Sequence, residues 1–473
     1  MSIRRAAIIN AASKYCTVFV NLIANMMLAR ILDPEDYGVV AVMTVFSTFF
    51  LVFSDMGIGS AVIQDDTLTS GQVSDIFSWT AYIGLVLSVL FVFFSFGIAN
   101  FYQYGIYVPL GSILSLSIFF SSLNMVPNAM LLKKKKFVYS GIRNIIAALV
   151  NLLVTFWLAI IGLKAYSIIW GTVANTMTAF LINMAKLDLK FTLKPRISSF
   201  KQIFNFSVYQ LLYMIVNYFS RNLDNLLAGK VLGELKLGYY DKAYKLMLYP
   251  INNFAQVINP VLHPLLSEYK NDWKYIYKKY ISIVELMALA GFFCTAICWF
   301  GAEDIICILY GEKWISAAES FRILSVTIGI QMISSSAGSI YQSLSKTKLM
   351  FISGFVYMVE TVVCIIVGLG YGSIEALAVA VSVSLYLKFF IEHFFLIKIG
   401  MRMKLIGFYK SLVPYGISLF LSFFALTINK MLVGNIDNHI ISLGEIIVIG
   451  GAGYLLGLTV TGKLKTYIFK RTC

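Results

Sequence analysis

The sequence is poor in charged residues, which make up 13% of the 473, whereas 59% of the residues are hydrophobic. A soluble domain carries charge on roughly a quarter of its residues. The shortage excludes a surface that faces water over most of its area. It indicates a membrane protein, because the remaining surface suits lipid.

Residues that carry chemistry are also scarce. His263, His393 and His439 are scattered and form no metal-binding set. The six cysteines lie mostly within apolar runs, and no histidine or carboxylate cluster joins Cys294 and Cys298, which share a helix face. We therefore expect no metal site and no disulfide framework. The sequence contains no Walker A motif, which argues against ATP hydrolysis. Neither an enzyme nor a cofactor is predicted.

Long apolar runs are abundant instead. A helix needs about 20 apolar residues to cross about 30 Å of hydrocarbon. We predict an all-α integral membrane protein with 14 transmembrane helices, at approximately 7–31, 37–62, 75–100, 106–131, 138–162, 165–186, 203–229, 239–265, 280–300, 317–343, 349–369, 373–397, 406–429 and 441–462.

The basic residues indicate the orientation. Most of the 38 lysines and arginines fall on the connecting segments of one side, together with both termini, and seven fall on the other side. Lysine and arginine accumulate on cytoplasmic loops. We expect the N- and C-termini in the cytoplasm. The net charge of +15 is then an orientation signal and not a nucleic-acid-binding surface.

Two stretches about 200 residues apart are alike. LARILDPEDYG (28–38) precedes span two and LAGKVLGELKLG (227–238) precedes span eight, while GLKAYSII (162–169) resembles GLGYGSIE (368–375). Because six spans separate the copies, both would cross the membrane in the same direction, as a parallel repeat. We predict two six-helix bundles around a central cavity, at 1–186 and 203–398, with a cytoplasmic linker at 187–202 and two further helices at 399–473. Chance similarity between apolar sequences is the alternative.

Polar residues recur along one face of three predicted spans. At helical spacing they form narrow stripes, which cannot face lipid without a large cost. The stripes face either a water-filled cavity or neighbouring helices through hydrogen bonds. We predict the cavity, lined by Lys14, Asn21, Asn25, Asp55, Tyr213, Asn217, Arg221, Asp224, Lys245 and Gln256.

Charged residues within the membrane are candidates for coupling or gating. Lys14 and Asp55 each lie about 10 Å deep from the inner ends of their spans and could pair. Glu285, Glu360 and Lys388 lie in later spans. Charges paired to hold the packing are the alternative for each of them. The sequence leaves open whether H⁺ or Na⁺ drives transport.

Five stretches carry a resemblance to a known family. They are LARILDPEDYGVVAV, SDMGIGSAVIQ (54–64), NLDNLLAGKVLGELKLGYYDKAY (222–244), YPINNFAQVINPVLHPLLSEY (249–269) and LYGEKWISA (309–317). In order and spacing they resemble the bacterial polysaccharide transport proteins, which are lipid-linked oligosaccharide flippases. That family belongs to the multidrug/oligosaccharidyl-lipid/polysaccharide exporter superfamily.

The resemblance implies a function. A member moves an undecaprenyl-diphosphate-linked oligosaccharide from the inner to the outer leaflet by alternating access, for assembly of O-antigen, capsule, exopolysaccharide or a teichuronic-type polymer. It implies membrane lipid and the polymerase machinery as partners. It also implies that cavity lysines and arginines hold the diphosphate, here Lys14, Arg221 and Lys245. The predicted spans contain as many acidic as basic residues, and in this the sequence departs from a purely cationic cavity.

Two other functions remain open. A cation-coupled drug or small-molecule antiporter would share the fold and would use the embedded acids. A membrane-embedded glycan polymerase or ligase is the weaker alternative, because such enzymes need a sizeable outer loop and the predicted loops are short.

Overall fold

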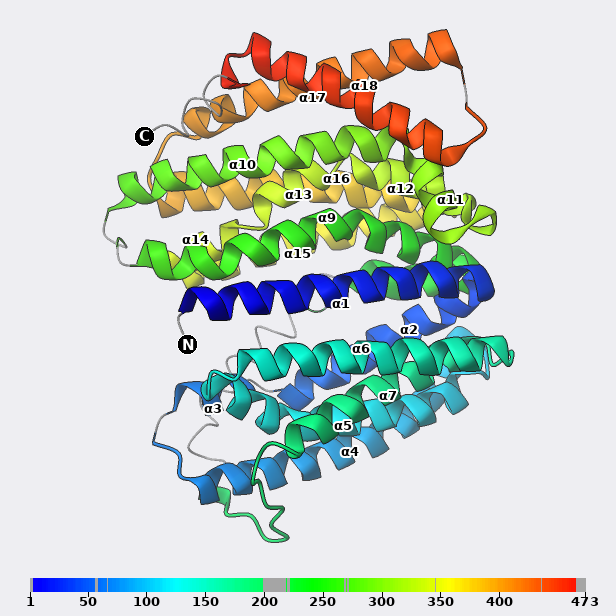
Figure 1. Cartoon of the computed structure of the whole chain (residues 1–473), viewed down its shortest axis with the longest axis vertical. Coiled ribbons are helices and arrows are strands. Elements are labelled where there is room, and N and C mark those ends of the chain that lie inside the picture. The colour runs from blue at the N-terminus through cyan, green and yellow to red at the C-terminus, as the bar shows by residue number, and fades with distance from the viewer. Residues whose placement is uncertain are drawn as a thin grey trace. The chain divides into compact units, whose positions relative to one another are not determined.

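The computed structural model describes residues 3–55, 58–65, 67–198, 218, 222–267, 269, 272–344, 346–434 and 436–464. For residues 3–15, 55, 60, 64, 255–265, 267 and 347 it describes the backbone alone. Every regular element within these residues is helical (Figure 1). The all-α prediction is confirmed for this part of the chain.

The chain divides into two compact units, residues 1–238 and 239–473. The helices of the first unit are α1 (Ile3–Ile31), α2 (Pro34–Asp55), α3 (Ile58–Gln64), α4 (Ser70–Tyr102), α5 (Tyr107–Lys133), α6 (Phe137–Ile160) and α7 (Ala165–Met184). Helix α9 (Glu234–Ser267) begins in the first unit and continues into the second.

The second unit continues with α10 (Trp273–Phe300), α11 (Ala302–Tyr310), the 3₁₀-helix η1 (Glu312–Trp314), α12 (Ser316–Ser325), α13 (Ile328–Ser334), α14 (Ala337–Ser343), α15 (Thr347–Gly370), α16 (Ile374–His393), the π-helix η2 (Phe394–Gly400), α17 (Leu405–Val433) and α18 (His439–Val460).

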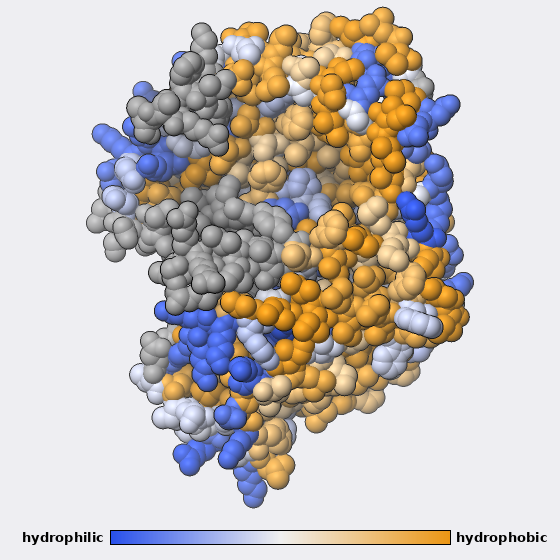
Figure 2. All heavy atoms as spheres, viewed as in Figure 1, coloured by the Kyte–Doolittle hydropathy of each residue, from blue (hydrophilic) through white to orange (hydrophobic). Residues whose placement is uncertain are grey.

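Ten helices of the described residues are long and apolar enough to cross a membrane, or eleven if one bent pair counts as a single span. Hydrophobic side chains cover the middle of these helices, and hydrophilic ones gather towards their ends (Figure 2). A multi-pass membrane protein is the arrangement that fits this surface. The number 14 stays a prediction, in part because most of the run 203–229 lies outside the described residues.

One predicted span is wrong in its continuity. The run 317–343 is three short helices, α12, α13 and α14, bent by 51° between α12 and the following pair. Helices α2 and α3 lie within the run 37–62, on either side of two residues outside the described ones. The run 373–397 lies within the apolar helical stretch Ile374–Gly400, whose last residues form the π-helix η2.

Hydroxyl groups bond back to the backbone at the bend. Ser325 and Thr327 each donate to the carbonyl oxygen three residues earlier, at 2.7 Å, and Ser335 and Ser336 do the same at the next break. Such bonds compete with the helical ladder and bend helices. Hydropathy alone does not register this competition.

The two similar corners contact one another within the first unit. A Cβ atom added to Gly38 would lie 1.8 Å from the carbonyl oxygen of Glu234, and one added to Gly238 would lie 1.9 Å from that of Pro34. The contact is therefore reciprocal, each glycine facing the residue that begins the other corner's helix. Two glycines at equivalent places let the two backbones touch.

Asp36 ties the first corner to α7. Its side chain is buried, with one carboxylate oxygen accepting from the amide of Ala165 at 3.1 Å and the other from the amide of Asp33 at 3.1 Å. Ala165 is the first residue of α7, so the carboxylate satisfies an amide that has no partner in that helix. It also lies at the positive end of the helix dipole.

Candidate functional site

A polar pocket of about 300 Å³ lies within the first unit. Its lining comes from three helices: Thr17 and Asn21 of α1, Asn144, Ala147, Ala148 and Asn151 of α6, and Thr172, Asn175 and Ala179 of α7. Four of these residues carry amides and two carry hydroxyls, which both donate and accept hydrogen bonds without charge. The volume is at the lower end of the range for small-molecule sites, about 300–1,000 Å³.

Helical spacing places these side chains together. The lining residues of α6 are spaced by three, one and three, and those of α7 by three and four. Such positions share one helix face. Alanines between the asparagines leave open the room that a larger side chain would fill.

Glycine at position 171 brings α7 close to α6. A Cβ atom there would lie 1.8 Å from the hydroxyl oxygen of Thr155 and 2.6 Å from the side-chain oxygen of Asn151. Thr155 donates to that same Asn151 oxygen at 2.9 Å. The close approach and this hydrogen bond fix the orientation of one pocket-lining amide.

A buried arginine lies beside the pocket. Arg143 of α6 is 7% exposed, and its guanidinium donates to the side-chain oxygen of Asn144 at 2.7 and 3.2 Å and to that of Asn128 at 2.7 Å. Among the described residues no carboxylate forms an ion pair with Arg143. Its partners are neutral amides, so its charge stays uncompensated by these bonds. Asn144 also lines the pocket.

Sequence reasoning missed Arg143 because it lies six residues into its apolar run, near the inner end. Long basic side chains at such positions normally reach the membrane surface. Asn144 and Asn151, seven residues apart, were the available signal: they predict a polar face on the same span as the arginine.

The structure places part of the predicted cavity set. Asn21 lines the pocket, and Asn25, one turn further, donates to the backbone oxygen of Asn21 at 2.9 Å. Asp224 is buried in the first unit. Lys245, in the second unit, is 58% exposed and pairs with Asp241 at 2.7 Å. The remaining members have no described side chain: Lys14, Asp55, Tyr213, Asn217, Arg221 and Gln256.

The predicted coupling residues have partners in the second unit. Glu285 of α10 forms an ion pair with Lys463 at 2.6 Å. Glu360 of α15 accepts from the thiol of Cys364 at 3.0 Å and from the hydroxyl of Ser384 at 3.2 Å. The ammonium of Lys388 lies 4.7 Å from the centre of the Tyr357 ring. Most of these contacts connect neighbouring elements. Such contacts are expected if the charges are paired to hold the helices together.

The chain is similar to known proteins. Residues 27–319 match the family described as "Polysaccharide biosynthesis protein". The chain is 22% identical over 393 residues to an "Uncharacterized membrane protein in cps region" of Klebsiella pneumoniae, covering 82% of this chain and 81% of that protein. It is 23% identical over 348 residues to the "Teichuronic acid biosynthesis protein TuaB" of Bacillus subtilis (strain 168), covering 72% and 71%.

A solved structure shares the fold. The lipid II flippase MurJ, in an inward closed conformation, superposes with a TM-score of 0.76 over 96% of this chain and 99% of that one, at 19% sequence identity. The resemblance found in the sequence is thereby confirmed, together with an all-helical fold of the MurJ kind. Since the family's match covers more than half of the chain, this multi-pass membrane protein belongs to the polysaccharide biosynthesis protein family.

Proposed function

We propose that the protein is a flippase that moves an undecaprenyl-diphosphate-linked oligosaccharide from the inner to the outer leaflet of the bacterial cytoplasmic membrane. The observation that carries the proposal is the buried guanidinium of Arg143, held by amide oxygens alone, next to an amide-lined pocket. The family and the fold support a transporter of a glycan precursor.

The two parts of the site match the two polar parts of such a substrate. A guanidinium forms strong, charge-assisted hydrogen bonds with phosphate oxygens. Asparagine and threonine side chains bond sugar hydroxyls in either direction. Arg143 then holds the diphosphate, the pocket holds part of the glycan, and the polyprenyl tail stays in lipid.

Lys14 and Arg221 remain candidates for the same diphosphate. Lys14 lies three and seven residues before Thr17 and Asn21 on α1, which puts it on the helix face that lines the pocket. Lys245 is the weaker candidate, because it is exposed and already paired with Asp241.

Alternating access is the proposed mechanism. The corners around Gly38 and Gly238, which meet in this structure, must separate when the protein opens to the outer side. The substrate is released as the corner contact breaks. The polymerase machinery would take up the glycan there.

The antiporter alternative depends on free acidic groups in the membrane. Glu285 and Glu360, two of its candidates, already accept from Lys463 and from Cys364 and Ser384. The polymerase or ligase alternative is weaker still, since the fold is that of a solved flippase. Coupling to H⁺ or Na⁺ stays a proposal for either transporter.

The test is complementation of a strain that lacks the gene. Surface polysaccharide and the lipid-linked repeat unit are quantified for Arg143→Gln, for Arg143→Lys and for Lys430→Gln, which removes an exposed positive charge at the end of α17. We expect at least a tenfold loss of surface glycan for Arg143→Gln with the precursor accumulating, partial function for Arg143→Lys, and normal display for Lys430→Gln. Membrane abundance of each variant is the control.

Two results would count against the proposal in different ways. Normal display in the deletion strain, together with a lost drug-efflux phenotype, rejects glycan transport itself. Normal display by an Arg143→Gln protein rejects this site while leaving the function intact.

A further inference from the structure

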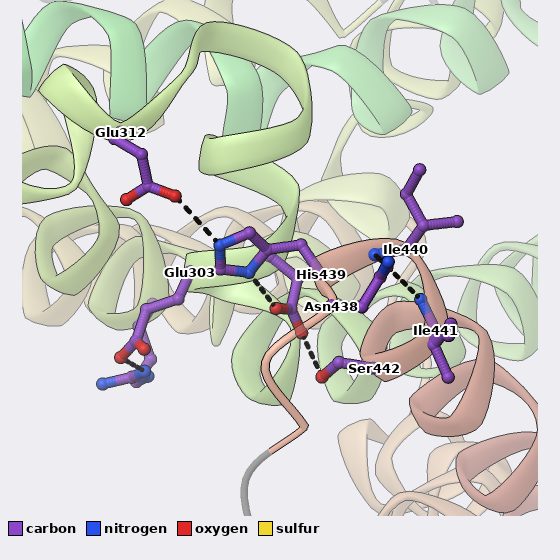
Figure 3. A network of polar contacts seen from close by, with 9 residues as sticks. Glu303, Glu312, Asn438, His439, Ile440, Ile441 and Ser442 are labelled. Atoms are coloured by element: carbon purple, nitrogen blue, oxygen red, sulfur yellow. Dashed lines mark hydrogen bonds and ion pairs between the residues drawn. The ribbon is translucent and has the colours of Figure 1, made fainter.

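Three potential metal ligands converge in the second unit from segments far apart in the sequence. Cys307 lies on α11, Glu312 begins η1, and His439 begins α18. One ligand atom from each lies within 4.8 Å of the other two. The Nε2 atom of His439 is 3.2 Å from a carboxylate oxygen of Glu312 (Figure 3).

The histidine is held by a second carboxylate. Its Nδ1 atom lies 2.7 Å from one carboxylate oxygen of Asp304, and the hydroxyl of Ser442 donates to the other at 2.6 Å. Figure 3 shows Ser442 and Glu312 on opposite sides of the imidazole. An imidazole whose Nδ1 carries a proton bound to carboxylate presents Nε2 as a metal ligand, the usual arrangement at protein-bound zinc.

Nearby acidic groups are engaged elsewhere. Glu303 lies 2.7 Å from the guanidinium of Arg322, and Glu319 pairs with the same guanidinium. Asp304 is buried between the histidine and Ser442. Glu312 is the carboxylate that faces the Nε2 atom of His439, and Cys307 has its sulfur within 4.8 Å of a ligand atom of each.

We propose that Cys307, Glu312 and His439 form a transition-metal site, with Asp304 and Ser442 orienting the histidine. A thiolate, an imidazole and a carboxylate form a ligand set that suits Zn²⁺, whereas Ca²⁺ and Mg²⁺ prefer oxygen ligands alone. Three protein ligands leave a fourth position for water.

The site joins α18 to the segment of α11 and η1, more than a hundred residues earlier. A bound metal would fix the start of α18, and with it the α17–α18 pair, onto that segment. By the predicted topology this end of the second unit is the outer one. The sequence alone predicted no metal site, because His439 lies more than a hundred residues from Cys307 and Glu312 along the chain and only the fold brings them together.

A hydrogen-bonded network without metal is the competing explanation. A protonated histidine between two carboxylates would also give the short contacts to Asp304 and Glu312. In that network the thiol of Cys307 is a neutral hydrogen-bond donor to Glu312, whereas a bound metal would take it as a thiolate ligand. The role of Cys307 therefore separates the two explanations.

The test uses the full chain, purified in detergent through a tag without histidines and stripped with EDTA. Zn²⁺ retained after desalting is measured for the unaltered protein, Cys307→Ser, Glu312→Gln and His439→Gln. Cys364→Ser is the matched control, because its thiol also donates to a glutamate but lies outside the cluster. Co²⁺ is added separately as a spectroscopic probe of a sulfur ligand.

We expect about one Zn²⁺ per chain for the unaltered protein and for Cys364→Ser, and at least tenfold weaker binding for the three cluster variants. The Co²⁺ complex should show a thiolate charge-transfer band that Cys307→Ser loses. Equal Zn²⁺ retention by Cys307→Ser, or a Co²⁺ spectrum without the sulfur band, would overturn the proposal. So would thermal unfolding that responds to pH through His439 but not to Zn²⁺. Because Glu312 is 78% exposed, Glu312→Gln tests the site even if Cys307→Ser does not fold.

Discussion

At the scale of single residues, uncharged amides distinguish this protein's pocket from a charged channel. Four asparagines line it, and the nearby guanidinium of Arg143 bonds to two amide oxygens and, among the described side chains, to no carboxylate. A buried charge without a counter-charge is costly, and it persists where a ligand supplies the opposite charge. The site thus fits a ligand with an anionic group beside neutral hydroxyls.

Asn175→Leu tests the pocket. Leucine keeps a similar size but removes an amide, so sugar hydroxyls would lose a partner while packing is retained. We expect about a five- to thirtyfold loss of glycan transport, as for about 1–2 kcal/mol of lost hydrogen bonding, with normal membrane abundance. Met177→Leu, at an exposed position on the same helix, is the control. Equal transport by the two variants would contradict a role for the pocket.

Cys307 should be a slow nucleophile in metal-free protein. Burial, and then the neighbouring carboxylates of Glu312, Asp304 and Glu303, raise the pKa of its thiol to about 11. Because the thiolate is the reactive form, alkylation in EDTA should be slow at neutral pH and should rise about tenfold per pH unit until the pH approaches 11.

The measurement uses a protein with Cys307 as its single cysteine. A second protein carries Glu303→Cys instead, at an exposed position of the same helix, and should react far faster at pH 7.5. A rate for Cys307 that is independent of pH would show that the thiol is not held in its neutral form.

At the scale of elements, the repeated corners and the broken helix show how small residues shape the fold. The corners require glycine because two backbones meet there. The bend in 316–343 arises where serine and threonine hydroxyls bond back to the helix. Both features depend on small residues: glycine at the corners, and serine and threonine at the bend.

Gly38→Ala and Gly238→Ala should each destabilise the corner contact. The added methyl would overlap a carbonyl oxygen, and such overpacking typically costs about 1–3 kcal/mol. We expect a lower midpoint of thermal unfolding in detergent for both variants. Gly97→Ala is the control, because no atom lies within 4 Å of its added methyl. An unchanged midpoint for Gly38→Ala would show that the corners move apart freely.

Asp36→Ala tests the link between the first corner and α7. It removes a buried carboxylate that accepts from the amides of Ala165 and Asp33. Hydrogen bonds to charged groups contribute about 1.5–3 kcal/mol, so the unfolding midpoint should fall markedly. Asp36→Asn should lose less, since its side-chain oxygen still accepts from one amide. Equal loss in the two variants would indicate that charge alone matters.

At the scale of the whole molecule, topology is the strongest prediction that the sequence supports. Lysine and arginine concentrate on one set of connecting segments, which should be cytoplasmic together with both termini. Alkaline phosphatase fused after Gly434 should be active, whereas fusion after Lys135 should be inactive. A fluorescent protein at the C-terminus should fluoresce. The reverse pattern would contradict both the orientation and the outer placement of the Cys307 cluster.

Composition and hydropathy determined the class of protein, because lipid imposes a length and an apolar surface on every span. The predicted runs coincide with helices α4 to α7, α10, α15, α17 and α18 in type and approximate bounds. The five stretches whose order and spacing resemble the polysaccharide transport proteins were enough to indicate the family, which the comparisons confirm. These signals are local or compositional, so they can be recognised in the sequence without knowledge of the fold.

Only the tertiary structure brought together Asn144, Arg143 and Asn128, or Cys307, Glu312 and His439. Their partners lie on different helices, and nothing in the spacing along the chain reveals which faces meet. The bend between α12 and α13 was hidden as well, because hydropathy does not distinguish a straight helix from a bent one. The sequence sets which segments enter the membrane, and side-chain packing decides which polar groups meet inside it.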